Sequence, residues 1–195
     1  MLDRAAAFDL VCQYTESDSL RKHMLAVEAA MRAYARRFAA AGGDADELRW
    51  GIVGLLHDFD YERWPNPPDH PLQGAKILAD LGYPADVIYA IKSHADYLED
   101  CPRVSLMDKT LYACDELAGL ITATARLRPE KIAGLAAGSV LKRFKQKSFA
   151  AAINRDDITR GAEDLGVPLD EHIQFVVDAM SGIAAELGLA ADGAS

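Results

Sequence analysis

The residues of this sequence that could do chemistry begin with one dipeptide, His57-Asp58. The residues before it, 50–56, are mostly apolar, as expected for a helix buried against a core. A histidine and an ionised aspartate at the end of such a helix need partners, because burying an unpaired charge is costly. Two interpretations are open. The pair is either a core histidine bonded to a backbone carbonyl beside a capping aspartate, or part of a metal site.

Other histidines and aspartates occupy positions that could converge on this pair. His23 lies three residues after the apolar Leu20, which places it toward the buried face of its helix. Asp115 and His94 also lie on apolar lines of predicted helices, and His70 stands at a helix start. Each alone has an ordinary explanation as a core histidine, a helix cap or an ion-pair partner. Because four of the five histidines belong to this set, their joint occurrence favours a shared site.

The residue types indicate which ions such a site would bind. Imidazole and carboxylate ligands together suit first-row divalent ions, including manganese, iron, cobalt, nickel and zinc. The three cysteines, Cys12, Cys101 and Cys114, show no CxxC spacing, which argues against a structural zinc site and against a disulfide framework. A shell with fewer protein ligands than coordination positions leaves room for water and substrate. The sequence therefore predicts a catalytic site for a divalent transition-metal ion.

Helices are the elements that must position these side chains. Apolar residues recur at steps of three and four, and glycines and prolines at 42–43, 65–68 and 82–84 interrupt the pattern. No alternation typical of β-strands and no internal repeat is present, so we expect an all-α protein. The expected helices span about 4–14, 19–40, 44–58, 70–81, 85–97, 106–125 and 169–187, with shorter pieces after 129.

The domain organisation expected from this pattern is a single domain over residues 1–195. Its core would span about 19–125, followed by C-terminal helices over about 129–188. The small and polar residues 190–195 are expected to form a flexible tail.

Composition narrows the class of partner. The chain has 195 residues, half of them apolar, and a formal charge of -9, which argues against binding to a nucleic-acid polymer. A small anionic substrate stays compatible, because a metal ion supplies local positive charge. The N-terminus does not resemble a signal peptide, and no apolar run is long enough to span a bilayer. We expect a cytoplasmic protein without a membrane partner; the oligomeric state is left open.

The order of these residues resembles a known family. His23, then His57-Asp58, then the distant Asp115, all on predicted helices, is similar to the HD superfamily of metal-dependent phosphohydrolases. His70-Pro71 and the run ending at His94 resemble the additional histidine motifs that hold a second metal in HD proteins. The segment from about 20 to 152 looks like a stand-alone HD subgroup described as predicted hydrolases. The resemblance implies a helical bundle of the HD type with a helical C-terminal extension.

Carried over by motif, the resemblance assigns two groups of ligands. The first metal would be held by His23, His57, Asp58 and Asp115. Asp58 could bridge to a second metal held by His70 and His94. His94 is followed by Ala95 rather than by another histidine, and the Gly-Tyr-Pro at 82–84 precedes it, so the HD-GYP pattern is not met. Cyclic di-GMP is therefore not the expected substrate.

The function that follows is hydrolysis of a small phosphate ester or nucleotide by metal-activated water. Asp58 is the expected catalytic residue, because it could orient or deprotonate that water. Basic residues near the C-terminal helices could receive phosphate oxygens, although a solvated helix face would look the same: Lys142, Arg143, Lys145 and Lys147. Two alternatives are a di-iron oxygenase with the same ligands and a non-catalytic, nucleotide-sensing protein of the HD fold.

Overall fold

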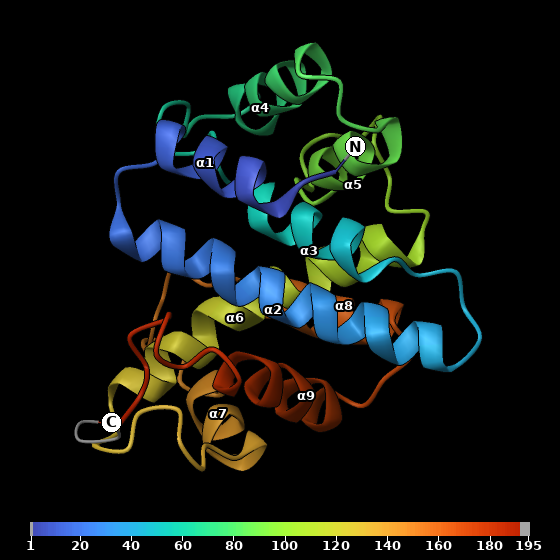
Figure 1. Ribbon diagram of the computed structural model, residues 1–195. Coiled ribbons are helices and arrows are strands. Elements are labelled where there is room, and N and C mark those ends of the chain that lie inside the picture. The colour runs from blue at the N-terminus through green and yellow to red at the C-terminus, as the bar shows by residue number, and fades with distance from the viewer. Residues whose placement is uncertain (1, 192–195) are drawn as a thin grey trace. The chain divides into compact units, whose positions relative to one another are not determined.

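The computed structural model describes residues 2–191, and all regular secondary structure in this range is helical (Figure 1). This confirms the expected all-α fold class. Two compact units are present, Met1–Leu111 and Tyr112–Ser195. The expected single domain stays a prediction. The expected flexible tail falls largely on residues 192–195, which lie outside the described residues.

The helices follow the predicted order along the chain. The first unit contains α1 (Arg4–Tyr14), α2 (Asp18–Ala40), α3 (Glu47–Leu56), α4 (Asp69–Asp80) and α5 (Ala85–Ser93). Helix α6 (Leu106–Arg126) begins in the first unit and continues into the second. The second unit also contains α7 (Ala137–Phe144), α8 (Arg155–Asp164) and α9 (Leu169–Ser181), and α9 packs against α7 and α8.

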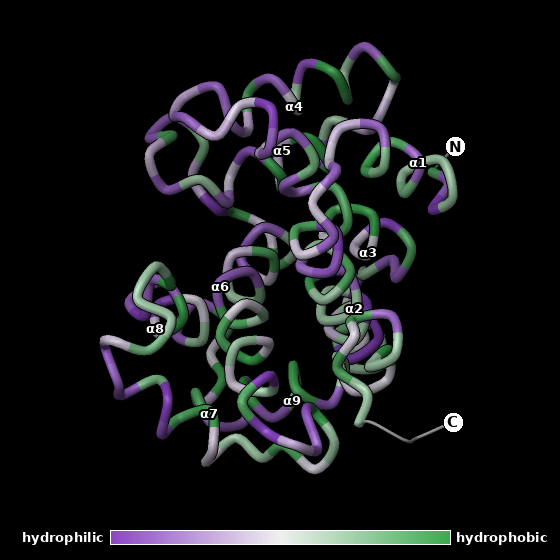
Figure 2. Tube along the Cα trace, turned by 90° about the vertical axis from the view of Figure 1, so that its left-hand side faces the viewer, coloured by the Kyte–Doolittle hydropathy of each residue, from purple (hydrophilic) through white to green (hydrophobic). Residues whose placement is uncertain are grey.

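Helix α3 forms the centre of the first unit, where it contacts α1, α2 and α5 (Figure 1). Its residues from Trp50 to Leu56 are all buried, and Figure 2 shows how rich in hydrophobic residues this helix is. Gly51 and Gly54 allow α2 to approach closely, because an added Cβ atom at either position would lie within 3.0 Å of an atom of α2. A Cβ atom at Gly54 would lie 2.9 Å from the backbone nitrogen of Glu28 and from the backbone oxygen of Val27. The two helices therefore pack nearly backbone to backbone.

Side-chain caps fix where the first helices begin. Asp3 accepts hydrogen bonds from the amides of the first turn of α1, Ser17 accepts one from Leu20 in α2, and Asp46 accepts one from Arg49 in α3. Such caps satisfy backbone N–H groups that have no partner within the helix.

Some helix ends differ from the sequence-based boundaries. Helix α5 ends at Ser93 rather than near residue 97, because the Nδ1–H of His94 donates to the carbonyl oxygen of Ile91. A continuing helix would need that oxygen for the amide of Ala95, which bonds instead to the oxygen of Lys92. Helix α3 ends one residue before His57, and α9 ends at Ser181 rather than near 187.

Within residues 2–191, no helix combines the length and the apolar composition that crossing a lipid bilayer requires. The cytoplasmic location stays a prediction.

Candidate metal centre

The His57-Asp58 dipeptide lies where α3 ends, at the start of a loop that leads to α4. His57 is fully buried and is the C-cap residue of α3. Its Nδ1–H donates to the carbonyl oxygen of Gly54 at 2.8 Å, so the end of the helix itself orients the ring. The first of the two sequence-based interpretations, a bond to a backbone carbonyl, is thus correct for one ring nitrogen and leaves the other to be explained.

Residues 15–17, which connect α1 to α2, and Tyr14 at the end of α1 hold the loop after Asp58. The Thr15 hydroxyl donates to the carbonyl oxygen of Phe59 at 3.0 Å. Glu62 accepts hydrogen bonds from the amides of Glu16 and Ser17, both at 3.0 Å. The Phe59 ring is fully buried and packs edge-on against Tyr14. The loop is therefore held through a backbone oxygen at Phe59 and through the side chains of Phe59 and Glu62.

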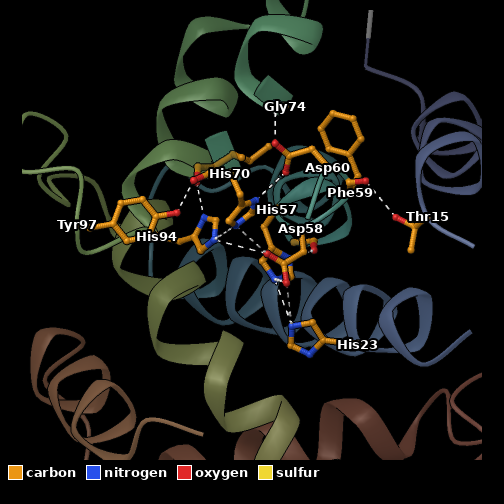
Figure 3. A network of polar contacts seen from close by, with 12 residues as sticks. Thr15, His23, His57, Asp58, Phe59, Asp60, His70, Gly74, His94 and Tyr97 are labelled. Atoms are coloured by element: carbon orange, nitrogen blue, oxygen red, sulfur yellow. Dashed lines mark hydrogen bonds and ion pairs between the residues drawn. The ribbon is translucent and has the colours of Figure 1, made fainter. Parts of the chain in front are cut away.

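His70 is oriented by a carboxylate (Figure 3). Its Nδ1–H donates to Oδ1 of Asp60 at 2.7 Å, and the other oxygen of Asp60 accepts from the amide of Gly74 at 2.7 Å. His70 has extended backbone angles, φ -77° and ψ 134°, within the first turn of α4. The Tyr97 hydroxyl donates to its carbonyl oxygen.

The hydrogen-bond partners assign the tautomer of three rings. Oxygens of carbonyl and carboxylate groups only accept, so Nδ1 carries the hydrogen in His57, His70 and His94. In each neutral ring, Nε2 then presents a lone pair. Orientation of the distal nitrogen in this way is the usual arrangement of metal-binding histidines.

The Nε2 atoms converge on Asp58, as the dashed lines of Figure 3 show. Oδ2 of Asp58 lies 3.3 Å from Nε2 of His57 and 3.8 Å from Nε2 of His23. Oδ1 lies 3.3 Å from Nε2 of His70 and 3.6 Å from Nε2 of His94. Each carboxylate oxygen therefore faces its own pair of imidazoles.

The electrostatics of the site favour positive charge between His70 and His94. The Nε2 atoms of His70 and His94 are 3.2 Å apart, and two lone pairs at that distance repel each other unless a proton or a metal ion lies between them. Burial lowers the pKa of His70, but the hydrogen bonds to Asp58 and Asp60 outweigh it and raise that pKa to about 9. Burial raises the pKa of Asp58, but the neighbouring histidines hold it well below its ordinary value.

The donor atoms form two sets suited to a divalent ion. The ligand atoms of His23, His57 and Asp58 lie within 4.8 Å of one another, and so do those of Asp58, His70 and His94. Nitrogen and oxygen donors of this kind suit a transition-metal ion, and a shared carboxylate could bridge two of them. We call these sets the first and the second ligand group.

The remaining candidate residues belong to the second unit. Asp115 lies on α6, and its role as a ligand of the first group stays a prediction. Lys142, Lys145 and Lys147 are exposed, while Arg143 donates to Gln146 and lies over the ring of Phe149. Their role in binding phosphate also stays a prediction.

The fifth histidine shows what a core histidine looks like in this protein. His172 is fully buried in the second unit, and its Nε2 bonds to the carbonyl oxygen of Ala113 at 2.9 Å. Because its Nε2 is bound to a backbone oxygen, His172 differs from the three histidines that bind oxygens through Nδ1.

Asp60 was missed by the sequence-based prediction, which placed neither a helix nor a candidate residue between the helices expected over 44–58 and 70–81. The proline content of this segment correctly excluded a helix, but it does not distinguish a solvated loop from one tied into a core. The spacing of Asp58 and Asp60, two carboxylates on either side of a buried phenylalanine, was the available signal.

Comparison with known proteins agrees with this geometry. The family model described as HD domain matches residues 20–120, which is just over half of the chain and includes every residue of both ligand groups. The chain therefore belongs to the HD domain family. No curated protein and no solved structure matches the chain.

Proposed function

We propose that this protein is a metal-dependent phosphohydrolase that acts on a small phosphate ester or nucleotide. The observation that carries the proposal is the placement of Asp58 between two pairs of imidazoles, each close to one of its oxygens. Membership of the HD domain family, which is associated with metal-dependent hydrolases, supports the same reaction class.

The two ligand groups would divide the work of holding the ions. His23, His57 and Asp58, with Asp115 as the predicted fourth ligand, would hold one ion. Asp58, His70 and His94 would hold the other. When bound, such ions lower the pKa of water and offset the charge that develops on phosphoryl oxygens.

The chain contributes the orientation of the ligand rings. The fixed Nδ1–H bonds of His57, His70 and His94 keep the rings from rotating, so little reorganisation is needed when ions and substrate bind. Asp58 is only partly shielded, with 16% of its side chain exposed, whereas His57 has no exposed surface. We assign to Asp58 the additional role of orienting the attacking water.

Metal content and hydrolysis test the proposal together. Purified protein would be assayed against a panel of phosphomonoesters, nucleotides and phosphodiesters with manganese, cobalt, nickel, zinc or ferrous iron under anaerobic conditions. Asp58→Asn is expected to abolish turnover and most bound metal while leaving helical content near that of the wild type. Asp69→Asn, at an exposed aspartate in the first turn of α4, is the matched control and is expected to behave as wild type.

Two outcomes would contradict the proposal. Full metal occupancy in Asp58→Asn would mean that the ligand assignment is wrong. Absence of hydrolysis across the whole panel with metal-loaded wild-type protein would reject the reaction class and favour the nucleotide-sensing alternative.

A di-iron oxygenase is the second candidate, and the complete second ligand group favours it. His70 and His94 would give a second iron two imidazoles beside the shared Asp58. The discriminating measurement is consumption of dioxygen by protein loaded with ferrous iron, in the presence of small organic substrates and without phosphate release.

A further inference from the structure

Among the three rings whose Nδ1 partner is defined, only that of His70 is oriented by a charged group. His57 and His94 donate to backbone carbonyl oxygens of their own helices. His70 donates to the carboxylate of Asp60, of which 1% of the side chain is exposed. A buried carboxylate accepts a stronger hydrogen bond than a carbonyl does and makes the distal nitrogen a better donor to a metal.

Asp60 is itself held on several sides. Its second oxygen accepts the amide hydrogen of Gly74, fourteen residues along the chain. Its backbone oxygen accepts from the amides of Arg63 and Trp64 at 3.1 and 3.0 Å, which closes a turn around it. The carboxylate is thus placed by α4 and by its own loop, independently of any ligand.

Gly74 is required for this approach. A Cβ atom at this position would lie 2.8 Å from both Cγ and Oδ2 of Asp60, closer than side chains pack. Its φ is not in the left-handed region, so the requirement comes from space rather than from backbone conformation. The sequence from Asp60 to Gly74 therefore contains a matched pair, a carboxylate and the only residue small enough to face it.

We propose that Asp60 is a positioning residue of the second ligand group, which sets the affinity of that group for its ion by fixing and polarising His70. The proposal rests on the metal binding of the proposed function but not on the reaction catalysed. Asp60 lies behind His70, because it bonds to Nδ1, on the side of the ring opposite the nitrogen that faces Asp58.

An asparagine at position 60 would change the hydrogen-bond pattern without changing the shape. The Gly74 amide can only donate, so it would select the asparagine oxygen and turn the side-chain NH₂ toward His70. His70 would then have to accept through Nδ1 and carry its hydrogen on Nε2, where it can no longer bind a metal. The variant should lose one ion selectively.

The test is a titration of metal-free protein with Mn²⁺, with free Mn²⁺ measured by electron paramagnetic resonance. Wild type is expected to bind two ions. Asp60→Asn is expected to weaken one of the two binding constants by about 10- to 100-fold and to leave the other within about twofold. Asp69→Asn serves as the control for removing a nearby negative charge and is expected to match wild type.

A double-mutant cycle separates positioning from a general structural role. His70→Ala removes the second group's imidazole, and adding Asp60→Asn to it should leave Mn²⁺ binding at the first group unchanged. Gly74→Ala is an independent variant that displaces the same carboxylate and should reproduce the selective loss.

Three results would overturn the proposal. These are binding of only one Mn²⁺ by wild type, an equal weakening of both binding constants in Asp60→Asn, or a further loss when Asp60→Asn is added to His70→Ala. Because no result depends on turnover, failure of the proposed hydrolysis would be seen separately in the substrate panel.

Discussion

Replacing Gly54 by alanine tests how α2 and α3 are packed. The new methyl group would lie 2.9 Å from the nitrogen of Glu28, the oxygen of Val27 and Cγ of Met31, where ordinary contact begins at 3.4 Å. Two of these atoms are backbone, so α3 must move away from α2 by about 0.5 Å. Overpacking of this kind costs about 3 kcal/mol at the upper end of its usual range. The higher helix propensity of alanine offsets about 1 kcal/mol of it.

The expected net loss in the free energy of unfolding is therefore about 2 kcal/mol. Urea unfolding followed by circular dichroism measures it. Gly138→Ala is the matched control, because it lies in α7 and nothing is within 4 Å of its added Cβ. That variant should be stabilised by up to about 1 kcal/mol.

The same displacement should reach the first ligand group. His57 follows the end of α3 and His23 lies on α2, with their Nε2 atoms 3.3 Å apart. Gly54→Ala should therefore weaken Mn²⁺ binding by the first group more than by the second. A variant as stable as wild type, with both binding constants unchanged, would refute the close packing of these helices.

Two further predictions concern residues outside the site. Cys114 and Cys101 are buried, and burial raises the pKa of both thiols. Native protein should therefore be alkylated at Cys12 far faster than at the other two cysteines, which peptide mass spectrometry would measure. Equal labelling of all three cysteines would contradict this expectation. Burial raises the pKa of the Glu47 carboxyl, but the Arg32 and Arg36 guanidinium groups outweigh burial, so the folded-state pKa is lowered. The stability that ionised Glu47 contributes is therefore fully present above pH 4.5, the ordinary pKa, and is lost as pH falls through the lowered folded-state pKa. Because the pair is partly exposed, Glu47→Gln should cost about 0.5 kcal/mol at pH 7 and nothing in strong acid; denaturant titrations at both pH values decide it.

The helices could be predicted from the sequence because their signals are local. Spacing of apolar residues located every helix of the first unit, and glycines and prolines marked several of the breaks between them. The error at the end of α5 arose because a side chain competed with the backbone: the ring of His94 bonds to the carbonyl oxygen that the next helical amide would need. No propensity scale contains that competition, because it depends on the ring's orientation.

The cluster of histidines around Asp58 could be predicted from residue types and positions, whereas the residues that orient it could not. Four histidines and Asp58 were identifiable because inward-facing imidazoles and carboxylates are uncommon without a purpose. Asp60 could not be assigned a role from sequence, because its role depends on the amide of Gly74 and the ring of His70, which only tertiary structure brings to it. Every residue except proline has a backbone N–H, so the sequence does not indicate that the N–H of Gly74 is the one that binds Asp60.

The hydrogen bonds between the loop after Asp58 and the residues that connect α1 to α2 determine where this protein can be shortened. The family model matches the chain only from residue 20 onward, whereas Thr15, Glu16 and Ser17 form hydrogen bonds with the loop that follows Asp58. A chain trimmed to residues 20–120 would keep every candidate ligand of the first unit but lose the hydrogen bonds that Thr15, Glu16 and Ser17 make to this loop. In this protein the smallest piece that keeps the candidate ion site and these hydrogen bonds should therefore begin at or before Thr15, upstream of the segment that the family model matches.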